Sequence, residues 1–158
     1  MSILPRSMME YEVDAVANLW HDTWHQSHDQ IVPRALCEFR DKRYFHSCIE
    51  REFTAVRVLG MPGEPIGLCI AKDTNLDMLF IAATEQGKGF GERLLDDAET
   101  RMRGSGVKEA YLHVALGNVR AIRFYHRCGW SDGGTTEKLL EIEGGTMTNL
   151  VGHMIKRL

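Results

Sequence analysis

The segment Gln86-Gly87-Lys88-Gly89-Phe90-Gly91 places three alternating glycines between an apolar run, Leu76–Ala83, and an amphipathic stretch. Glycine lets a backbone pass close to a ligand, and the first turn of a helix presents N–H groups that have no intrahelical partner. These donors, together with the positive end of the helix dipole, suit a phosphate or pyrophosphate. The segment therefore predicts a strand, a glycine turn and a helix that together form a phosphate site.

The spacing of the glycines argues against two common phosphate-binding motifs. A P-loop requires a hydroxyl residue directly after its lysine, but Gly89 follows Lys88. A dinucleotide fingerprint requires a third glycine where this chain has Glu92, and an acidic residue at the end of the next strand. Glu109 instead precedes that strand. A further alternative, in which the glycines only form a tight strand-to-helix turn, remains open from this segment alone.

Composition limits the class of protein before any other motif is used. A chain of 158 residues with 44% hydrophobic and 26% charged residues fits one globular domain spanning residues 1–158. A net charge of −3 does not favour a nucleic-acid partner. No apolar run reaches the length of about 20 residues that a membrane span needs, and no signal pattern begins the chain. Free thiols in a reducing cytoplasm are expected of the cysteines, which show no paired spacing: Cys37, Cys48, Cys69 and Cys128.

Periodicity and turn residues predict a mixed α+β domain. Helices are expected over residues 13–24, from Pro33 to near His46, over 90–102 and over Val119–Arg127. Strands are expected at Ser2–Arg6, Thr54–Leu59, Ile66–Lys72, Leu76–Ala82, Ala110–Val114, Thr135–Ile142 and Met147–Lys156. The resulting order, β-α-α-β-β-β-α-β-α-β-β, predicts a mostly antiparallel mixed sheet with helices packed on it.

A second motif lies downstream, Asn118-Val119-Arg120-Ala121-Ile122-Arg123-Phe124-Tyr125-His126-Arg127-Cys128-Gly129-Trp130. Together with Gln86-x-x-Gly89-x-Gly91 it closely resembles the GNAT superfamily of acetyl-CoA-dependent N-acyltransferases. That family carries Gln/Arg-x-x-Gly-x-Gly/Ala and then Asn-x-x-Ala-x-x-Phe-Tyr-x-x-x-Gly-Phe. The chain departs from the family's common residues at three positions: Ala83 for proline, Gln86 for arginine and Trp130 for phenylalanine.

The resemblance implies acetyl-CoA as co-substrate and no metal. The pyrophosphate would lie on the backbone N–H groups of Gln86, Gly87, Lys88, Gly89, Phe90 and Gly91, with Glu92 just inside the helix; a Cβ at Gly89 or Gly91 would crowd it. The pantetheine arm would pair like an added strand near Phe80, Ile81 and Ala82, where a bulge could direct an N–H at the thioester carbonyl. Asn118 would bind the arm or cap the next helix, and Phe124 would lie beside the cofactor.

The reaction that the resemblance implies is direct attack by a primary amine of a small molecule or peptide, through a tetrahedral intermediate. Tyr125 stands at the family's general-acid position and would protonate the leaving thiolate, although a packed tyrosine is the alternative. Asp77, with Asn75 as a possible water ligand nearby, and His113 are candidates for the base, and each could equally be a structural polar residue. A non-catalytic CoA-binding regulatory or sensor module, or a nucleotide-binding domain, are the alternative functions.

The acceptor side is less defined. His21, His25 and His28 share one helical face, but no acidic or cysteine pattern completes a zinc site. Because the family's first two helices wall the acceptor pocket, Trp24, His25 and His28 are candidate acceptor-binding residues. The mildly acidic charge slightly favours a small basic amine. A homodimer formed through the closing strands is also expected.

Overall fold

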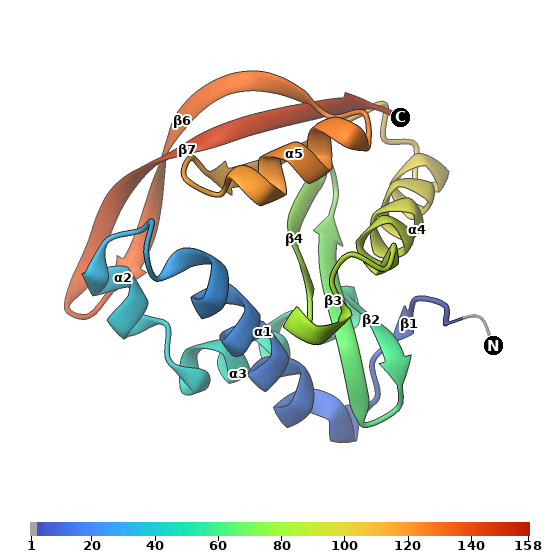
Figure 1. Ribbon diagram of the computed structural model, residues 1–158, viewed down its shortest axis with the longest axis horizontal. Coiled ribbons are helices and arrows are strands. Elements are labelled where there is room, and N and C mark those ends of the chain that lie inside the picture. The colour runs from blue at the N-terminus through green and yellow to red at the C-terminus, as the bar shows by residue number, and fades with distance from the viewer. Residues whose placement is uncertain (1–2) are drawn as a thin grey trace.

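The computed structural model describes residues 3–158 and places all strands in one sheet with the order β1-β2-β3-β4-β5-β7-β6. Neighbouring strands are antiparallel except for β4 and β5, which are parallel. The strands are β1 (Arg6–Ser7), β2 (Val56–Met61), β3 (Glu64–Lys72), β4 (Asn75–Ile81), β5 (Glu109–Ala115), β6 (Ser131–Ile142) and β7 (Gly145–Arg157). The helices are α1 (Val13–His28), α2 (Arg34–Phe39), α3 (Lys42–Arg51), α4 (Phe90–Gly104) and α5 (Val119–Arg127). Figure 1 shows their arrangement.

The predicted mixed α+β class and element order are confirmed, with one correction among the helices. The single helix expected from Pro33 to near His46 is two helices, α2 and α3. The break follows because Asp41 caps α3, accepting a hydrogen bond from the Tyr44 N–H at 2.8 Å. The carbonyl of Arg40 bonds the His25 ring 2.5 Å away. The first strand covers Arg6–Ser7 rather than Ser2–Arg6, and residue 2 lies outside the described residues.

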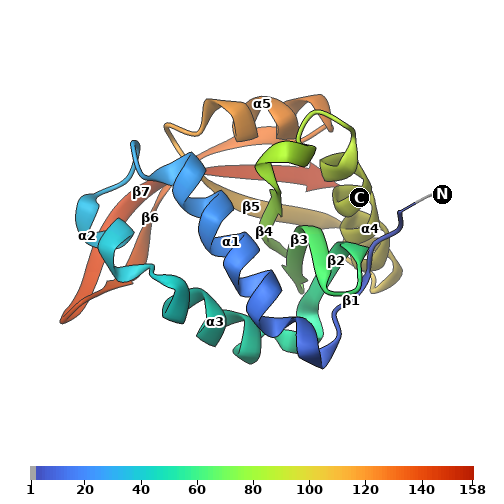
Figure 2. The same cartoon turned by 60° about the horizontal axis from the view of Figure 1, so that its bottom comes forward.

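The central strands bury both faces, which divides the core into two clusters. On β3, Leu68 and Ile70 face the cluster formed with α1 and α3, whereas Cys69 faces the cluster under α4. This follows from the two-residue period of a strand, which sends successive side chains to opposite faces. Figure 2 shows α1 and α3 on one side of the sheet, with α4 at the other side. Burial on both faces of the sheet therefore explains why β3 carries apolar residues at consecutive positions.

A buried charged network fixes α5 relative to α4 and β7. Glu99 on α4 is 5% exposed, and its carboxylate accepts hydrogen bonds from the Lys156 ammonium and the Trp130 indole N–H. The Lys156 ammonium also donates to the Cys128 carbonyl at 2.7 Å, just after α5. Buried charges are stable when they are paired and hydrogen-bonded in this way. The network therefore holds the end of α5, and with it Tyr125, against the sheet.

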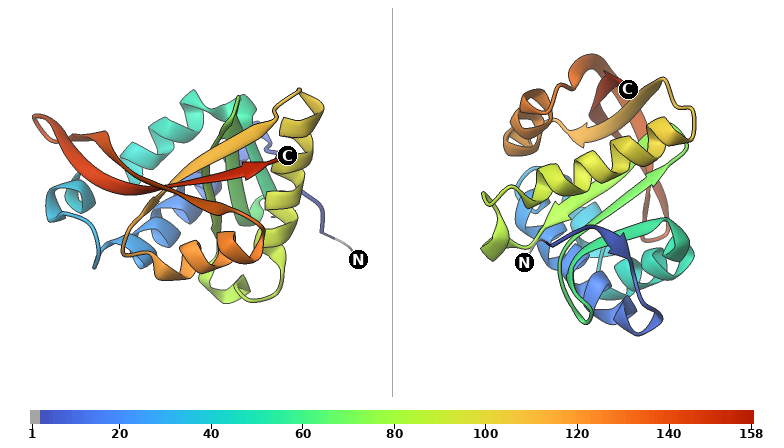
Figure 3. Two further views of the ribbon diagram at one scale, coloured as in Figure 1. Left: turned by 90° about the horizontal axis from the view of Figure 1, so that it is seen from above. Right: turned by 90° about the vertical axis from the view of Figure 1, so that its right-hand side faces the viewer.

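The sheet opens between β4 and β5. Their pairing is confined to Asn75 and Tyr111 among the described residues, at the start of β4. Beyond this pair the two strands diverge, which Figure 3 shows in its right-hand view. Antiparallel β5, β7 and β6 then continue as a second half of the sheet, and the long β6–β7 hairpin reaches toward α2. The divergence leaves a gap in the sheet beside the glycine segment.

Candidate active site

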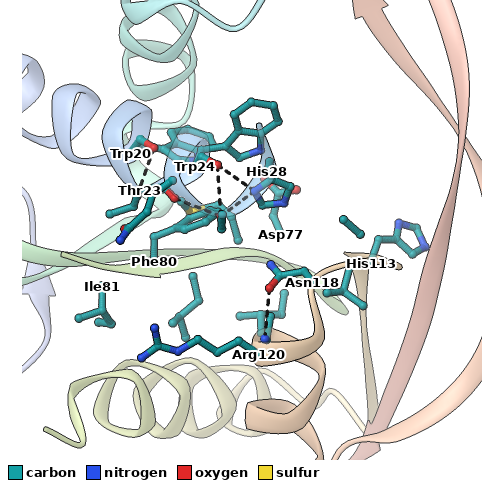
Figure 4. A pocket seen from close by; sticks show the side chains of 18 of the residues that line it. Trp20, Thr23, Trp24, His28, Asp77, Phe80, Ile81, His113, Asn118 and Arg120 are labelled. Atoms are coloured by element: carbon teal, nitrogen blue, oxygen red, sulfur yellow. Dashed lines mark hydrogen bonds between the residues drawn. The ribbon is translucent and has the colours of Figure 1, made fainter. Parts of the chain in front are cut away.

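A single cavity of about 1010 Å³ occupies the region between β4 and β5. It is lined by the glycine segment, β4, the start of α5, the C-terminal half of α1, and β6. The loop after α1 meets the loop after β5 beside it, since a Cβ on Gly117 would lie 3.0 Å from Ile31. Figure 4 shows Trp24 and His28 on one side of the strand that carries Phe80, with Arg120 on the other. One cavity therefore joins the predicted cofactor loop to the predicted acceptor wall.

The glycine segment presents a row of backbone donors to this cavity. Gly87 and Gly89 adopt left-handed conformations, with φ of 78° and 84°, and Gly89 is the N-cap of α4. Within residues 3–158, no backbone N–H from Gln86 to Glu92 donates to a protein acceptor; the first such bond of the helix is from Arg93 to Gly89. A left-handed cap followed by unpaired N–H groups forms a concave anion site.

The second and third glycines of the segment, Gly89 and Gly91, have different physical roles. A Cβ on Gly89 would meet no atom within 4 Å, so glycine is favoured there by its positive φ. A Cβ on Gly91 would lie 3.2 Å from two ring carbons of Phe124. Gly91 therefore permits close packing of α4 against α5, which is a role that the glycine spacing alone does not reveal.

The polar side chains of the loop bond within the protein. The amide nitrogen of Gln86 donates to the Ile81 carbonyl at 2.9 Å, which ties the loop to the end of β4. Lys88 forms an ion pair with Glu85 at 2.9 Å, and Glu92 is exposed in the first turn of α4. Anion binding at this loop therefore depends on its backbone N–H groups and on the dipole of α4.

The end of β4 leaves alternate backbone groups free. The Ala82 N–H donates to the Ile66 carbonyl, and the Phe80 carbonyl faces β3, 3.3 Å from an added Cβ on Gly67. Because backbone groups alternate in direction along an antiparallel strand, the intervening Ile81 and also Leu79 turn theirs toward the gap. Leu79, which sequence reasoning missed, therefore joins Ile81 as a backbone partner for a ligand in the gap.

The pairing of β4 with β3 shifts register at Asp77, three residues before Phe80, where a bulge was expected. Ile70 pairs with Met78 and Ala71 pairs with Leu76, so Asp77 between them has no partner on β3. Asp77 is exposed and lines the cavity. A bulge of this kind re-aims a side chain, and here it carries the one acidic residue of β4. The pairing of β4 with β3 is regular at Phe80 and Ile81, so the bulge expected there is not found and the register shift lies at Asp77 instead.

Tyr125 and Asn118 border the cavity from α5. The Tyr125 side chain is 8% exposed and packs edge-on against Phe124 and Trp130. Burial raises its pKa well above the ordinary value of a phenol, so the hydroxyl remains protonated at neutral pH. The Asn118 side-chain oxygen accepts the Ala121 N–H at 3.3 Å, the dashed line beside Asn118 in Figure 4, and so caps α5.

His113 lies on β5 opposite His153, with ring centroids 5.2 Å apart. Burial is the main cause that lowers its pKa; nearby Lys138 and His153 lower it further, while Asp77 raises it. His113 is therefore neutral at neutral pH. Figure 4 shows His113 and Trp24 at opposite sides of the cavity.

Of the three residues predicted on the acceptor side, His25 links two elements of the fold, whereas Trp24 and His28 line the cavity. His25 bonds Asp29 at 2.6 Å and the Arg40 carbonyl at 2.5 Å, so its ring joins α1 to the α2–α3 break. His28 stacks on Trp24 with ring centroids 4.7 Å apart, and both rings line the cavity. Burial lowers the pKa of His28 to about 4, which keeps this ring uncharged.

Two cations that sequence reasoning missed also line the cavity, Arg40 at the end of α2 and Lys138 on β6. Lys138 occupies a partly buried position of β6, alternating with the exposed Glu137 and Leu139. In the sequence, the signal for this site is a charged residue at a strand position whose side chain alternates with the exposed ones. Arg40 lies in the break between two helices and carries no comparable pattern.

No helix within residues 3–158 is both long and apolar enough to cross a membrane. No group of three or more histidine, cysteine, aspartate or glutamate side chains in this part of the chain is arranged to hold a metal ion.

The model of the acetyltransferase (GNAT) family matches residues 13–130, which span α1 to the end of the second sequence motif. This chain belongs to the GNAT family. The predicted superfamily is therefore confirmed, and the chain is an acyltransferase by family. A comparison with curated protein sequences finds no significant match.

Solved GNAT structures share the fold over the full chain at low sequence identity. A GCN5-related N-acetyltransferase from Rhodopseudomonas palustris is 18% identical, with a TM-score of 0.77 over 100% of this chain and 97% of that chain. PaiA N-acetyltransferase from Thermoplasma acidophilum, in complex with coenzyme A, is 20% identical, with a TM-score of 0.72 over 100% of both chains. A putative acetyltransferase from Salmonella typhimurium with acetyl-CoA is 16% identical, with a TM-score of 0.67 over 100% and 95%.

Proposed function

We propose that this GNAT protein transfers an acetyl group from acetyl-CoA to the primary amine of a small molecule or peptide by direct attack. The observation that carries the proposal is the row of unpaired N–H groups from Gln86 to Glu92, which opens into the same cavity as Tyr125 and Asp77. Solved structures of two proteins of similar fold contain coenzyme A or acetyl-CoA. The donor set supports pyrophosphate binding because backbone N–H groups at a helix start bind such anions.

The gap between β4 and β5 supports binding of the pantetheine arm. An extended chain that carries amide groups can pair with an open strand edge, as an added strand does. The backbone groups of Leu79 and the N–H of Ile81 supply that edge, whereas the Ile81 carbonyl already accepts from the Gln86 amide. The capping amide of Asn118 retains its N–H donors on the other side of the gap. Acetyl-CoA, when bound, supplies a thioester whose carbonyl carbon is open to attack by an amine.

Tyr125 is the proposed general acid. As the nitrogen–carbon bond forms and the carbon–sulfur bond breaks, the sulfur leaves as a thiolate that requires a proton. The raised pKa of Tyr125 keeps its hydroxyl protonated, and no hydrogen bond to another described residue occupies that hydroxyl. Its place at the buried wall of the cavity supports this role.

Asp77 is the proposed acceptor of the amine's proton. It lies on the bulge of β4, is exposed, and lines the cavity. His113 is the weaker candidate because its ring lies against His153 on the far side. A carboxylate in this position both attracts a protonated amine and passes its proton to water.

The function is tested by CoA release with a panel of amines, together with calorimetric binding of CoA. The proposal expects CoA binding, acetyl transfer to an amine, and loss of turnover without loss of CoA binding in Tyr125→Phe. CoA binding without turnover of any amine would instead support the regulatory or sensor alternative. No binding of CoA or acetyl-CoA would contradict the proposal altogether.

We also propose that residues 1–158 act as one domain in the cytoplasm and that the protein forms a homodimer. The four cysteines are free thiols, which suits a reducing compartment. In the β6–β7 hairpin, Leu139 and Leu150 are 69% and 49% exposed, and β6 lies at an edge of the sheet. Sedimentation of the full chain tests the dimer, with Leu139→Glu expected to shift it toward monomer.

A further inference from the structure

The acceptor end of the cavity carries two cations that have no carboxylate partner. Among the charged residues lining the cavity, Arg51 pairs with Glu52, and Arg120 and Arg127 belong to α5 beside the cofactor loop. Arg40 and Lys138 remain, and no acidic group of the described chain lies within salt-bridge distance of either. Such groups indicate the charge of whatever binds beside them.

Arg40 is held in place without being neutralised. Its guanidinium carbon lies 4.8 Å from the Trp24 ring centroid and 5.3 Å from that of Tyr44. Its carbonyl is bonded by His25, and its Nε is buried with no hydrogen-bond partner. Ring faces stabilise a guanidinium while leaving its in-plane N–H groups free. The fork of Arg40 is therefore preorganised to donate to a planar anion such as a carboxylate.

Lys138 reaches the same region from β6, which packs against α2. Burial is the main cause that lowers the pKa of Lys138, and the charge of Arg40 lowers it further. Two cations that repel each other in a partly buried site are stabilised when an anion binds between them. Both side chains line the same cavity, although 98 positions in sequence separate them.

Asp77 supplies the opposite charge. It lines the same cavity as Lys138 and His113, and its charge acts to raise the pKa of both. The stacked rings of Trp24 and His28 form an uncharged wall between the cations and the end of β4. The site thus presents Arg40, Lys138 and Asp77 around an apolar surface, and Glu141, also on β6, lines the same cavity.

From this arrangement we propose that the acceptor is an amine that also bears a carboxylate, as in an amino acid, with Arg40 and Lys138 binding the carboxylate and Asp77 receiving the amine. The inference rests on the proposed acetyltransferase function and specifies its substrate class. It reverses the weak expectation of a basic amine from the net charge of −3, because nearby charges outweigh a dispersed surface charge.

The test compares matched acceptors on the full-length enzyme with saturating acetyl-CoA. Each of the twenty standard amino acids is assayed beside its amide and its decarboxylated amine, and an aminophosphonate analogue separates carboxylate from other anions. We expect kcat/KM at least about 10-fold higher for the preferred amino acid than for its amide, because the neutral amide cannot form the charge-assisted hydrogen bonds. An equal or lower kcat/KM for the amino acids would overturn the inference.

Substitutions of Arg40 and Lys138 test whether these two cations cause the preference for a carboxylate. Arg40→Gln and Lys138→Gln are expected to reduce the amino-acid-to-amide ratio of kcat/KM about 10-fold, while calorimetric CoA affinity stays unchanged. Arg34→Gln, an exposed arginine on α2 paired with Glu38, is the matched control and should leave the ratio unaltered. An unchanged ratio in both cation variants would contradict the inference.

The two proposals fail in different ways. If amines are acetylated without a preference for carboxylate, only the acceptor inference is wrong. If CoA does not bind, the proposed function is wrong. If CoA binds but nothing is acetylated, binding of the amino acids to the CoA-bound protein is measured by calorimetry. Binding that weakens in Arg40→Gln would support the carboxylate subsite, and no binding would overturn it.

Discussion

The backbone of Gly91 lies directly against the ring of Phe124, and a Cβ at position 91 would be 3.2 Å from two of its carbons. This contact sets the spacing between the first turn of α4 and α5, which carry the cofactor loop and Tyr125. The two sequence motifs that identify the family therefore meet physically at this point.

Gly91→Ala should weaken CoA binding by about 10-fold and destabilise the fold by about 1–3 kcal/mol, because the new methyl group forces Phe124 to move. Calorimetry with CoA and urea unfolding measure the two effects. Gly104→Ala at the other end of α4 is the control, since nothing lies within 4 Å of the added Cβ. Unchanged CoA affinity in Gly91→Ala would contradict the packing role.

Tyr125→Phe should reduce kcat by about 100-fold, a typical contribution of general acid catalysis, with little change in CoA affinity. The packing against Phe124 and Trp130 is retained because only the hydroxyl is removed. Steady-state kinetics and calorimetry separate the two quantities. A wild-type kcat at every pH would exclude Tyr125 as the acid.

Asp77→Asn should lower kcat/KM by about 100-fold, whereas His113→Gln should lower it by less than about 5-fold. The reason is that Asp77 faces the cavity on the bulge of β4 and His113 packs against His153. Single-turnover rates with a fixed amine make the comparison. The reverse order of the two effects would transfer the role of base to His113.

Glu12 should make the free energy of unfolding depend on pH in the acidic range. Its buried carboxylate accepts hydrogen bonds from Arg6, Met9 and Gly63, and the Arg6 guanidinium is the main cause that lowers its pKa to about 2 from 4.5. A lowered pKa gives stability that is present above pH 4.5 and is lost as the pH falls toward 2. The loss amounts to about 3 kcal/mol, because each tenfold change in proton affinity between the folded and unfolded states is worth about 1.4 kcal/mol.

Glu12→Gln should therefore cost about 3–5 kcal/mol at pH 7, since it leaves Arg6 without its partner, and much less near pH 3. Urea unfolding at pH 7, 5 and 3 measures the difference from wild type. Glu38→Gln, which breaks an exposed pair with Arg34, should cost under about 1 kcal/mol at every pH. A difference for Glu12→Gln that does not shrink with acid would rule out this linkage.

How much the sequence predicts depends on whether the determining contacts are local. Helix α5 begins and ends at the predicted residues, Val119 and Arg127, because its cap and apolar stripe lie within one segment. The break between α2 and α3 was missed because it involves a bond from His25 to the Arg40 carbonyl, fifteen residues away. The residue pattern of one segment cannot indicate a contact with a residue so far away in the sequence.

The same distinction applies to the site. The glycine loop was predicted because its φ values and its donors follow from glycine spacing and a helix start. Arg40 and Lys138 come together only when α2 packs on β6, so no sequence motif joins them. The location of the bulge at Asp77 likewise depends on how β3 and β4 pair.

The restriction of β4–β5 pairing to Asn75 and Tyr111 also has a mechanical consequence. A rotation by a few degrees about that end displaces the opposite ends of the strands farthest, at Ile81 and Ala115. Those ends carry the loops that begin α4 and α5. Small angular motion of the two half-sheets therefore changes the width of the gap most strongly where the proposed ligand would thread through it, and an occupant paired with both sides would suppress that motion.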